Sequence, residues 1–250
     1  MSELLQLILL ALLGGLSGFI NILAGGGSLL TLPFLIFMGL PVPLANGTNR
    51  VAILVQNIPA IFNFHKFDVI PHGAILVTTA PSIVGAIIGA QLAVDIDELL
   101  FKRVLAIIMV LVMAFSFSKN KPASPTGHIR ISARSKWGLG ISFFFVGIYG
   151  GFIQAGLGFF IITILTIAGY DLVRTNALKI LVVLVYTPFA LAIFMFNGQV
   201  DWPKGIVLSA GSAVGAWLSS RVAVKKGHNF IRWFVLVTVI VFAIQLFWGD

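Results

Sequence analysis

Long apolar stretches separated by short polar connections fill almost all of this 250-residue chain. A helix that crosses a bilayer needs about 20 predominantly apolar residues. Uninterrupted stretches of about that length cover residues 49–64, 74–94, 99–117, 176–196, 205–220 and 230–248. Two further apolar stretches, at residues 4–38 and 139–168, are interrupted by glycines. The pattern predicts an all-α integral membrane protein.

The two interruptions are the most informative part of the pattern. Ala24-Gly25-Gly26-Gly27-Ser28 divides the first stretch, and Ala155-Gly156-Leu157-Gly158 divides the second. Backbone that leaves the helix loses hydrogen bonds that lipid cannot replace, so such breaks occur where protein or a water-filled cavity surrounds them. Broken helices at matching positions of two halves are typical of substrate sites in transporters. We therefore expect a transport site at these breaks.

Composition narrows the class of protein. The chain is 59% hydrophobic and 10% charged, whereas soluble domains have roughly 25% charged residues. No cysteine is present, which excludes disulfides, thiolate metal sites and cysteine nucleophiles. No span contains a histidine or a pair of aspartates for catalysis, and no Walker-type phosphate loop occurs, so we expect neither an enzyme nor ATP drive. No cofactor or metal is expected.

The distribution of Lys and Arg predicts how the broken stretches lie in the membrane. The net charge of +8 comes from basic residues in short loops, which the positive-inside rule explains better than nucleic-acid binding. If each broken stretch crossed the membrane once, seven of the 16 basic residues would lie inside. If each returns to its starting side as a hairpin, twelve of the 16 lie inside. The hairpin arrangement therefore fits the rule, with the central basic loop cytoplasmic and both termini outside.

The hairpin arrangement also predicts a duplicated fold. Each half then has a hairpin and three spans, and an odd number of crossings inverts the second half relative to the first. Residues such as Gly39 and Gly169, or Asn46 and Asn176, correspond at a spacing of about 130. We expect two inverted-topology repeats, at residues 1–117 and 138–250, joined by a basic linker at 118–137.

Pairs of glycines four residues apart recur in both halves. They are Gly14 with Gly18, Gly85 with Gly89, Gly147 with Gly151, and Gly211 with Gly215. Small residues at this spacing let membrane helices approach closely, so we interpret these pairs as helix-packing contacts.

A helix that restarts after a glycine break offers backbone N–H groups and about half a positive charge to an anion. If both breaks meet near the midplane, two helix N-termini converge on one anion between the repeats. Buried amides, hydroxyls and cations near the breaks complete the candidate set. The candidate substrate-binding residues are Gly25, Gly26, Gly27, Ser28, Asn46, Thr48, Asn49, Arg50, Gln154, Gly156, Gly158, Asn176 and Lys179.

Arg50 and Lys179 have two interpretations at this stage. Each lies just inside the start of a predicted span, where a charge is costly unless it is paired or functional. They either face the substrate or extend to the lipid headgroups. Likewise, each single buried amide could serve only as a hydrogen-bond strut between helices.

The motifs at the breaks resemble a known family. They comprise Gly18-Phe-Ile-Asn-Ile-Leu-Ala-Gly-Gly-Gly-Ser28, followed by Pro41 and by Ala45-Asn46-Gly47-Thr48-Asn49, with Gly151-Phe-Ile-Gln154-Ala-Gly-Leu-Gly158 in the second half. Together they are similar to the TauE/SafE sulfite exporter family over essentially the whole chain. In the second half, Thr175-Asn176-Ala177-Leu178-Lys179 departs from the Gly-Thr-Asn pattern. The resemblance implies an integral membrane carrier of a small sulfur-containing anion.

We therefore expect a multi-pass protein of the plasma (inner) membrane that transports sulfite or an organosulfonate by alternating access. An anion channel, or a carrier of another small carboxylate or inorganic anion, is the alternative. The expected partners are the small anion, the lipid bilayer and a coupling proton or sodium ion. Nucleic acid is not expected. The sequence indicates neither the direction of transport nor an oligomeric state.

Overall fold

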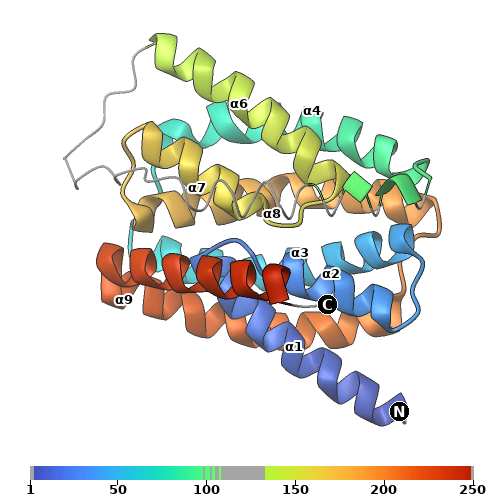
Figure 1. The fold of residues 1–250 in the computed structure, drawn as a ribbon. Coiled ribbons are helices and arrows are strands. Elements are labelled where there is room, and N and C mark those ends of the chain that lie inside the picture. The colour runs from blue at the N-terminus through green and yellow to red at the C-terminus, as the bar shows by residue number, and fades with distance from the viewer. Residues whose placement is uncertain (1–2, 98, 102, 105–106, 108–132, 249–250) are drawn as a thin grey trace.

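The computed structural model describes the chain except residues 1–2, 98, 102, 105–106, 108–132 and 249–250, and it describes no side chains at 133–135, 227–232 and 234–248. Its described residues form helices and contain no strand (Figure 1). The helices are α1 (Glu3–Leu23), α2 (Ser28–Phe37), α3 (Val42–Lys66), α4 (His72–Val94), α6 (Ala133–Phe152), α7 (Leu157–Ile167), α8 (Leu172–Phe196) and α9 (Trp202–Trp248).

The long helices form two sets that each combine both halves of the chain. In the first set, α1, α3 and the first part of α9 run in the same direction (Figure 1). The hydroxyl of Ser219 donates to the carbonyl of Phe19, and Asn63 donates to Ser220, so these helices stay in register. In the second set, α4, α6 and α8 run in the opposite direction, and Gln199 after α8 donates to the carbonyl of Val94.

Glycines hold the helices of each set close together, as the glycine spacing predicts. A Cβ atom added to Gly18 would lie 2.2 Å from the carbonyl oxygen of Ser212, and one added to Gly215 would lie 1.9 Å from that of Gly15. The α4–α6 contact is built in the same way, because a Cβ on Gly85 would lie 2.2 Å from the carbonyl oxygen of Phe144. Backbones at this separation leave no room for a side chain.

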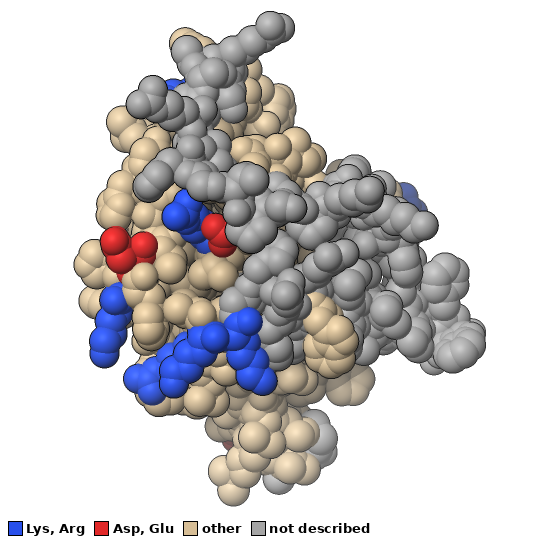
Figure 2. Space-filling view, turned by 90° about the vertical axis from the view of Figure 1, so that its left-hand side faces the viewer, with Lys and Arg blue, Asp and Glu red and all other residues tan. Residues whose placement is uncertain are grey.

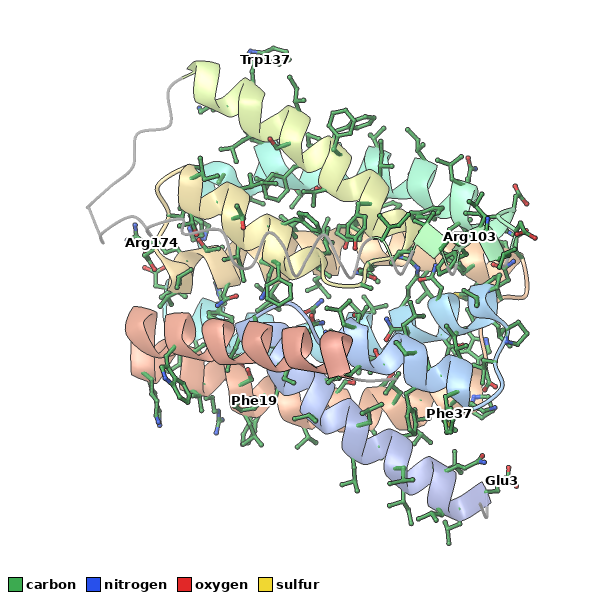
Figure 3. All side chains as sticks on the ribbon, viewed as in Figure 1. Glu3, Phe19, Phe37, Arg103, Trp137 and Arg174 are labelled. Atoms are coloured by element: carbon green, nitrogen blue, oxygen red, sulfur yellow. The ribbon has the colours of Figure 1, made fainter. Side chains whose placement is uncertain are left out.

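Each broken stretch forms a hairpin. Residues 24–27 separate α1 from α2, and residues 153–156 separate α6 from α7. Figure 3 places Glu3, at the start of α1, and Phe37, at the end of α2, at the same end of the molecule, with Arg174 at the opposite end. In Figure 1, α6 starts and α7 ends at that opposite end. The two hairpins therefore enter the bundle from opposite ends.

Among the described residues, four helices are long and apolar enough to cross a membrane: α1, α4, α8 and residues Trp202–Lys226 of α9. Exposed apolar side chains cover the outer surface of α1, where Leu4, Leu12 and Leu16 are 70%, 67% and 54% exposed. Exposed leucine over several turns is typical of a helix that faces lipid.

Helix α3 is long enough to span a membrane but carries many polar residues. Apart from His65 and Lys66 in its last turn, its polar residues are nonetheless buried. They are Asn46, Thr48, Asn49, Arg50, Gln56, Asn57 and Asn63. Because these side chains face protein rather than lipid, a low hydropathy is compatible with its central position beside α8 and α9. The predicted span at 49–64 lies within α3.

Two other predicted spans match helices of the structure, and the remaining predictions differ from it or fall largely outside the described residues. The spans at 74–94 and 176–196 lie within α4 and α8. Helix α9 continues through residues 221–229, where the hydropathy pattern predicts a connection between the spans 205–220 and 230–248. The predicted span at 99–117 and linker at 118–137 fall largely outside the described residues.

Candidate functional site

The two glycine breaks meet each other in the middle of the bundle. The backbone N–H of Gly158 donates to the carbonyl of Gly25 at 3.3 Å. A Cβ on either glycine would lie 2.2 Å from the other's Cα. Two segments more than a hundred residues apart thus touch through bare backbone, and each touches the other at the start of a short helix.

The breaks have the same backbone design. After α1, the N–H groups of Ala24 and Gly25 both donate to the carbonyl of Ile20, at 2.8 and 3.2 Å. After α6, the N–H groups of Ile153 and Gln154 donate to the carbonyl of Tyr149 in the same way, at 2.9 and 3.3 Å. Two residues after the end of each helix the backbone is left-handed, with φ of +83° at Gly25 and +62° at Gln154. Glycine is the usual residue in this cap position, so a glutamine there is a strained exception.

Lys179 of α8 caps the broken end of α1. Its ammonium donates to the carbonyls of Asn21 and Ile22 at 3.0 and 2.8 Å, and to the side-chain oxygen of Asn176 at 2.7 Å. The amide of Asn176 donates in turn to the carbonyl of Leu23 at 3.3 Å. The last carbonyls of a helix lack partners and carry partial negative charge, so a buried cation there is stabilised.

Arg50 of α3 caps the broken end of α6 in the same manner. Its guanidinium donates to the carbonyls of Gly150 (2.9 Å) and Gly151, and lies 3.5 Å from the side-chain oxygen of Gln154. Its Cζ lies 4.6 Å from the ring centroid of Phe194. Asn46 donates to the carbonyl of Phe152 at 2.7 Å, completing the match with Asn176.

Both cations are buried, with Arg50 0% and Lys179 3% exposed. Because both side chains are buried in protein, neither extends to the lipid headgroups, which was one of the two interpretations of the sequence. Only one of the two faces the space between the breaks, because Lys179 lines the cavity described next and Arg50 does not.

A small cavity of about 20 Å³ lies where the breaks meet. A volume of that order holds about one water molecule. Its walls combine the starts of α2 and α7 with polar and apolar side chains of α3 and α8. The lining residues are Asn21, Gly25, Ser28, Ile53, Asn57, Gln154, Leu157, Gly158, Lys179, Ile180 and Val183. It is thus bounded by two helix N-termini and an ammonium group, which together favour negative charge.

The predicted site residues divide into those at the cavity and those behind it. Gly25, Ser28, Gln154, Gly158 and Lys179 line the cavity. Gly26, Gly27 and Gly156 shape the breaks, and Gly27 packs against the backbone of Ser17. Three further candidates, Asn46, Arg50 and Asn176, bind the helix ends.

Two predicted residues lie elsewhere. The hydroxyl of Thr48 donates to the carbonyl of Leu44 at 2.6 Å and accepts from the backbone N–H of Asp201 at 2.9 Å, so it joins α3 to the start of α9. The side-chain oxygen of Asn49 accepts from Thr31 of α2 at 2.6 Å, while its amide nitrogen is buried without a partner. Neither residue lines the cavity.

Other residues of the site are absent from the predicted set. Asn57 lines the cavity, and its amide nitrogen is buried without a hydrogen-bond partner. Tyr186 lies behind Gln154, whose amide donates to its hydroxyl at 2.9 Å and to Thr187 at 3.3 Å. Asn57 is one of several buried amides of α3, and the sequence alone does not distinguish it from its neighbours. In the structure it lies one helical turn beyond Ile53, which also lines the cavity.

Comparison with known proteins places this architecture in a family. The family described as "Sulfite exporter TauE/SafE" matches residues 10–246. A "Probable membrane transporter protein" of Haemophilus influenzae is 28% identical, over 92% of this chain and 90% of its own length. "Probable membrane transporter protein YfcA" of Escherichia coli K12 is 27% identical over 94% of this chain and 87% of its own length, and ORF9 of a Sinorhizobium species is 26% identical over 92% and 88%.

No solved structure matches the chain. The family and the names of the relatives indicate a membrane transporter rather than an enzyme. The family match covers the two breaks, the helices that pack on them and nearly all of the chain. The chain therefore belongs to the TauE/SafE sulfite exporter family and is a membrane transporter.

Proposed function

We propose that this transporter is a secondary carrier of a small sulfur-containing oxyanion, sulfite or an organosulfonate, and that it binds the anion where the two breaks meet. The observation that carries the proposal is the contact of Gly25 with Gly158, which directs the N-termini of α2 and α7 at one cavity beside Lys179. Helix N-termini and an ammonium group attract an anion without a metal.

The proposal includes an inverted repeat. Supporting it, the hairpins enter from opposite ends, and each half contributes a cation to the broken helix of the other half. The small-residue contact of α1 with α9 has its counterpart in that of α6 with α4. Two halves built alike and oppositely oriented provide a site that opens to one side and then the other.

The size of the cavity bears on the mechanism. At about 20 Å³ it is too small for an oxyanion, so substrate entry requires the two breaks to separate. Their contact is a single backbone hydrogen bond of 3.3 Å. Separation of the halves around a closed site is the behaviour expected of a carrier, whereas a channel needs an open path.

We further propose that the end of the molecule at which α3 ends and α8 begins is cytoplasmic. Lys and Arg side chains gather on that end (Figure 2), and they include Lys66, Arg174, Arg221, Lys225 and Lys226. Because the chain lacks cysteine, Glu3→Cys and Lys225→Cys can be labelled singly with an impermeant maleimide. The proposal requires them to react from opposite faces of the membrane.

Transport in proteoliposomes tests the function. Purified protein is reconstituted, and uptake of ³⁵S-sulfite is compared with that of sulfate, thiosulfate, taurine and acetate, with and without an imposed proton or sodium gradient. The proposal predicts saturable sulfite uptake that a gradient or membrane potential accelerates. Uptake that stays linear with concentration would identify a channel, and absence of uptake of any sulfur oxyanion would refute the proposal.

A further inference from the structure

We infer that Asn57 and Ser28 supply the direct hydrogen bonds to the transported anion, that Lys179 contributes charge without touching it, and that the substrate carries no cationic group. The inference rests on the proposed function and deepens it, because it assigns roles within the cavity and a chemical class to its ligand.

Lys179 has no donor left for a ligand. An ammonium group has three N–H donors. All three are used, on the carbonyls of Asn21 and Ile22 and on the side-chain oxygen of Asn176, at distances of 2.7 to 3.0 Å. Breaking either of the first two bonds would leave a helix-end carbonyl without its partner, and breaking the third would leave the buried oxygen of Asn176 without its donor. Lys179 therefore acts on an anion in the cavity through its charge.

Asn57, unlike Lys179, has a side-chain donor without a hydrogen-bond partner. Its side chain is 3% exposed and lines the cavity, yet its amide nitrogen has no hydrogen-bond partner. A buried donor without a partner costs about 1–3 kcal/mol, and most such groups in proteins are satisfied. An oxyanion in the cavity would accept this N–H. Ser28, at the start of α2, lines the same cavity, and we assign its hydroxyl as the second donor.

Gln154, a second amide residue on the cavity, already uses the hydrogen-bonding groups of its side chain. Gln154 donates to Tyr186 and Thr187, at 2.9 and 3.3 Å, and its oxygen faces Arg50. Gln154 therefore shapes the wall of the cavity, whereas Asn57 remains available. The two halves of the transporter contribute unequally to ligand contact.

The lining also limits the chemistry of the substrate. Every Asp and Glu that the structure describes lies at a helix end or in a connection, and none of them lines the cavity. An ammonium group on the substrate would face the charge of Lys179 and the apolar wall of Ile53, Ile180 and Val183. A buried cation without a partner is strongly disfavoured. An anion with acceptor oxygens alone is accepted, and an amino-sulfonate zwitterion is not.

A matched pair of variants tests the role of Asn57. The neighbouring Gln56 is also buried, at 1% exposed, with its amide nitrogen unpartnered, but it does not line the cavity. We expect Asn57→Leu to raise the KM for sulfite in proteoliposomes by about tenfold or more, as for a lost hydrogen bond to a charged group. Gln56→Leu should leave it within about twofold. Sulfite should raise the Tm of detergent-solubilised wild type and Gln56→Leu, but not of Asn57→Leu.

Two additions keep the test decisive. Asn57→Asp preserves the shape but replaces the donor with an oxygen, and it should abolish the sulfite-induced Tm rise even if Asn57→Leu fails to insert. Ethanesulfonate and taurine differ only by the ammonium group, so ethanesulfonate should inhibit sulfite uptake at lower concentration than taurine. Equal effects of Asn57→Leu and Gln56→Leu, a full Tm shift in Asn57→Asp, or equal inhibition by both sulfonates would overturn the inference. Failure of the wild type to move any sulfur oxyanion would refute the proposed function instead.

Discussion

Arg50 and Lys179 each cap the end of one of the two broken helices. Arg50 donates to the carbonyls of Gly150 and Gly151 at the end of α6, and Lys179 donates to those of Asn21 and Ile22 at the end of α1. Each cation belongs to one half of the chain and caps a broken helix of the other half. In lipid, a helix that ends in the middle of the bundle must have its carbonyls satisfied by protein. These two side chains satisfy two carbonyls each, and Asn46 and Asn176 each satisfy one more.

Removal of either cation should therefore destabilise the protein. In Arg50→Met or Lys179→Met, at least two buried carbonyls lose their donor, and we expect the free energy of unfolding to fall by about 2 kcal/mol or more. The measurement is Tm in detergent. Arg174→Met is the control, because the side chain of Arg174 is 42% exposed and pairs with Asp171, three residues away on the same helix start. A Tm in Arg50→Met as high as in the control would contradict this account.

The contact between the breaks should tolerate no side chain. In Gly158→Ala, the new Cβ would lie 2.2 Å from the Cα of Gly25, so the breaks must separate. We expect a loss of about 1–3 kcal/mol of stability, as for overpacking, and a strong decrease in transport. Gly73→Ala is the control, since no heavy atom lies within 4 Å of its added Cβ. Unchanged uptake by Gly158→Ala would show that the closed contact has no part in transport.

Hydropathy and glycine spacing predict the helices and the breaks because both depend on local sequence. The glycine pairs predict close packing, and Gly18 against Ser212 and Gly85 against Phe144 bear it out. The partners of these glycines lie in distant segments, and spacing alone does not identify them. Likewise, a buried cation in a span signals a partner, but the partners of Arg50 and Lys179 are backbone carbonyls, which leave no trace in residue types.

Gln154 occupies a position where a glycine would be less strained. Its φ of +62° matches the +83° of Gly25, its counterpart in the first half. Gln154→Gly removes the hydrogen bonds to Tyr186 and Thr187 but relieves the backbone, whereas Gln154→Ala removes the same bonds without that relief. We expect Gln154→Ala to be about 1 kcal/mol less stable than Gln154→Gly, and both to transport poorly. Equal Tm values for the two variants would contradict the strain at this position.

The individual polar residues of α3 could not be ranked from sequence. Thr48, Asn49 and Asn57 are all polar residues within ten positions of one another, and only the first two are among the predicted site residues. In the structure, Thr48 binds Asp201, Asn49 binds Thr31 and Asn57 lines the cavity. A rotation of about 100° per residue around the helix separates these roles, and the position of the neighbouring helices decides which side faces the site.

Asp201 at the start of α9 gives a pH-dependent test of the fold. Burial alone would raise the pKa of its carboxyl, but the hydrogen bonds and charge of Lys204, with a side-chain distance of 2.6 Å, outweigh it and lower the pKa. A lowered folded-state pKa stabilises the protein above the ordinary value of about 3.9, and this stabilisation is lost as the pH falls through the lowered pKa.

We therefore expect Asp201→Asn to be about 1 kcal/mol less stable than the wild type at neutral pH, the size expected of a partly buried ion pair at a helix start. The difference in Tm should shrink as the pH falls below about 4. A difference that stayed constant from pH 7 to pH 3 would exclude the charge of Asp201 as its cause.

The central claim is that the anion binds where the two breaks meet. Selenite, the heavier relative of sulfite, scatters anomalously, so crystals grown with selenite would locate the anion directly. The account predicts one anomalous peak between the starts of α2 and α7, within hydrogen-bonding distance of the Asn57 amide and the Ser28 hydroxyl. A peak at another position, in a protein whose sulfite uptake selenite inhibits, would contradict it.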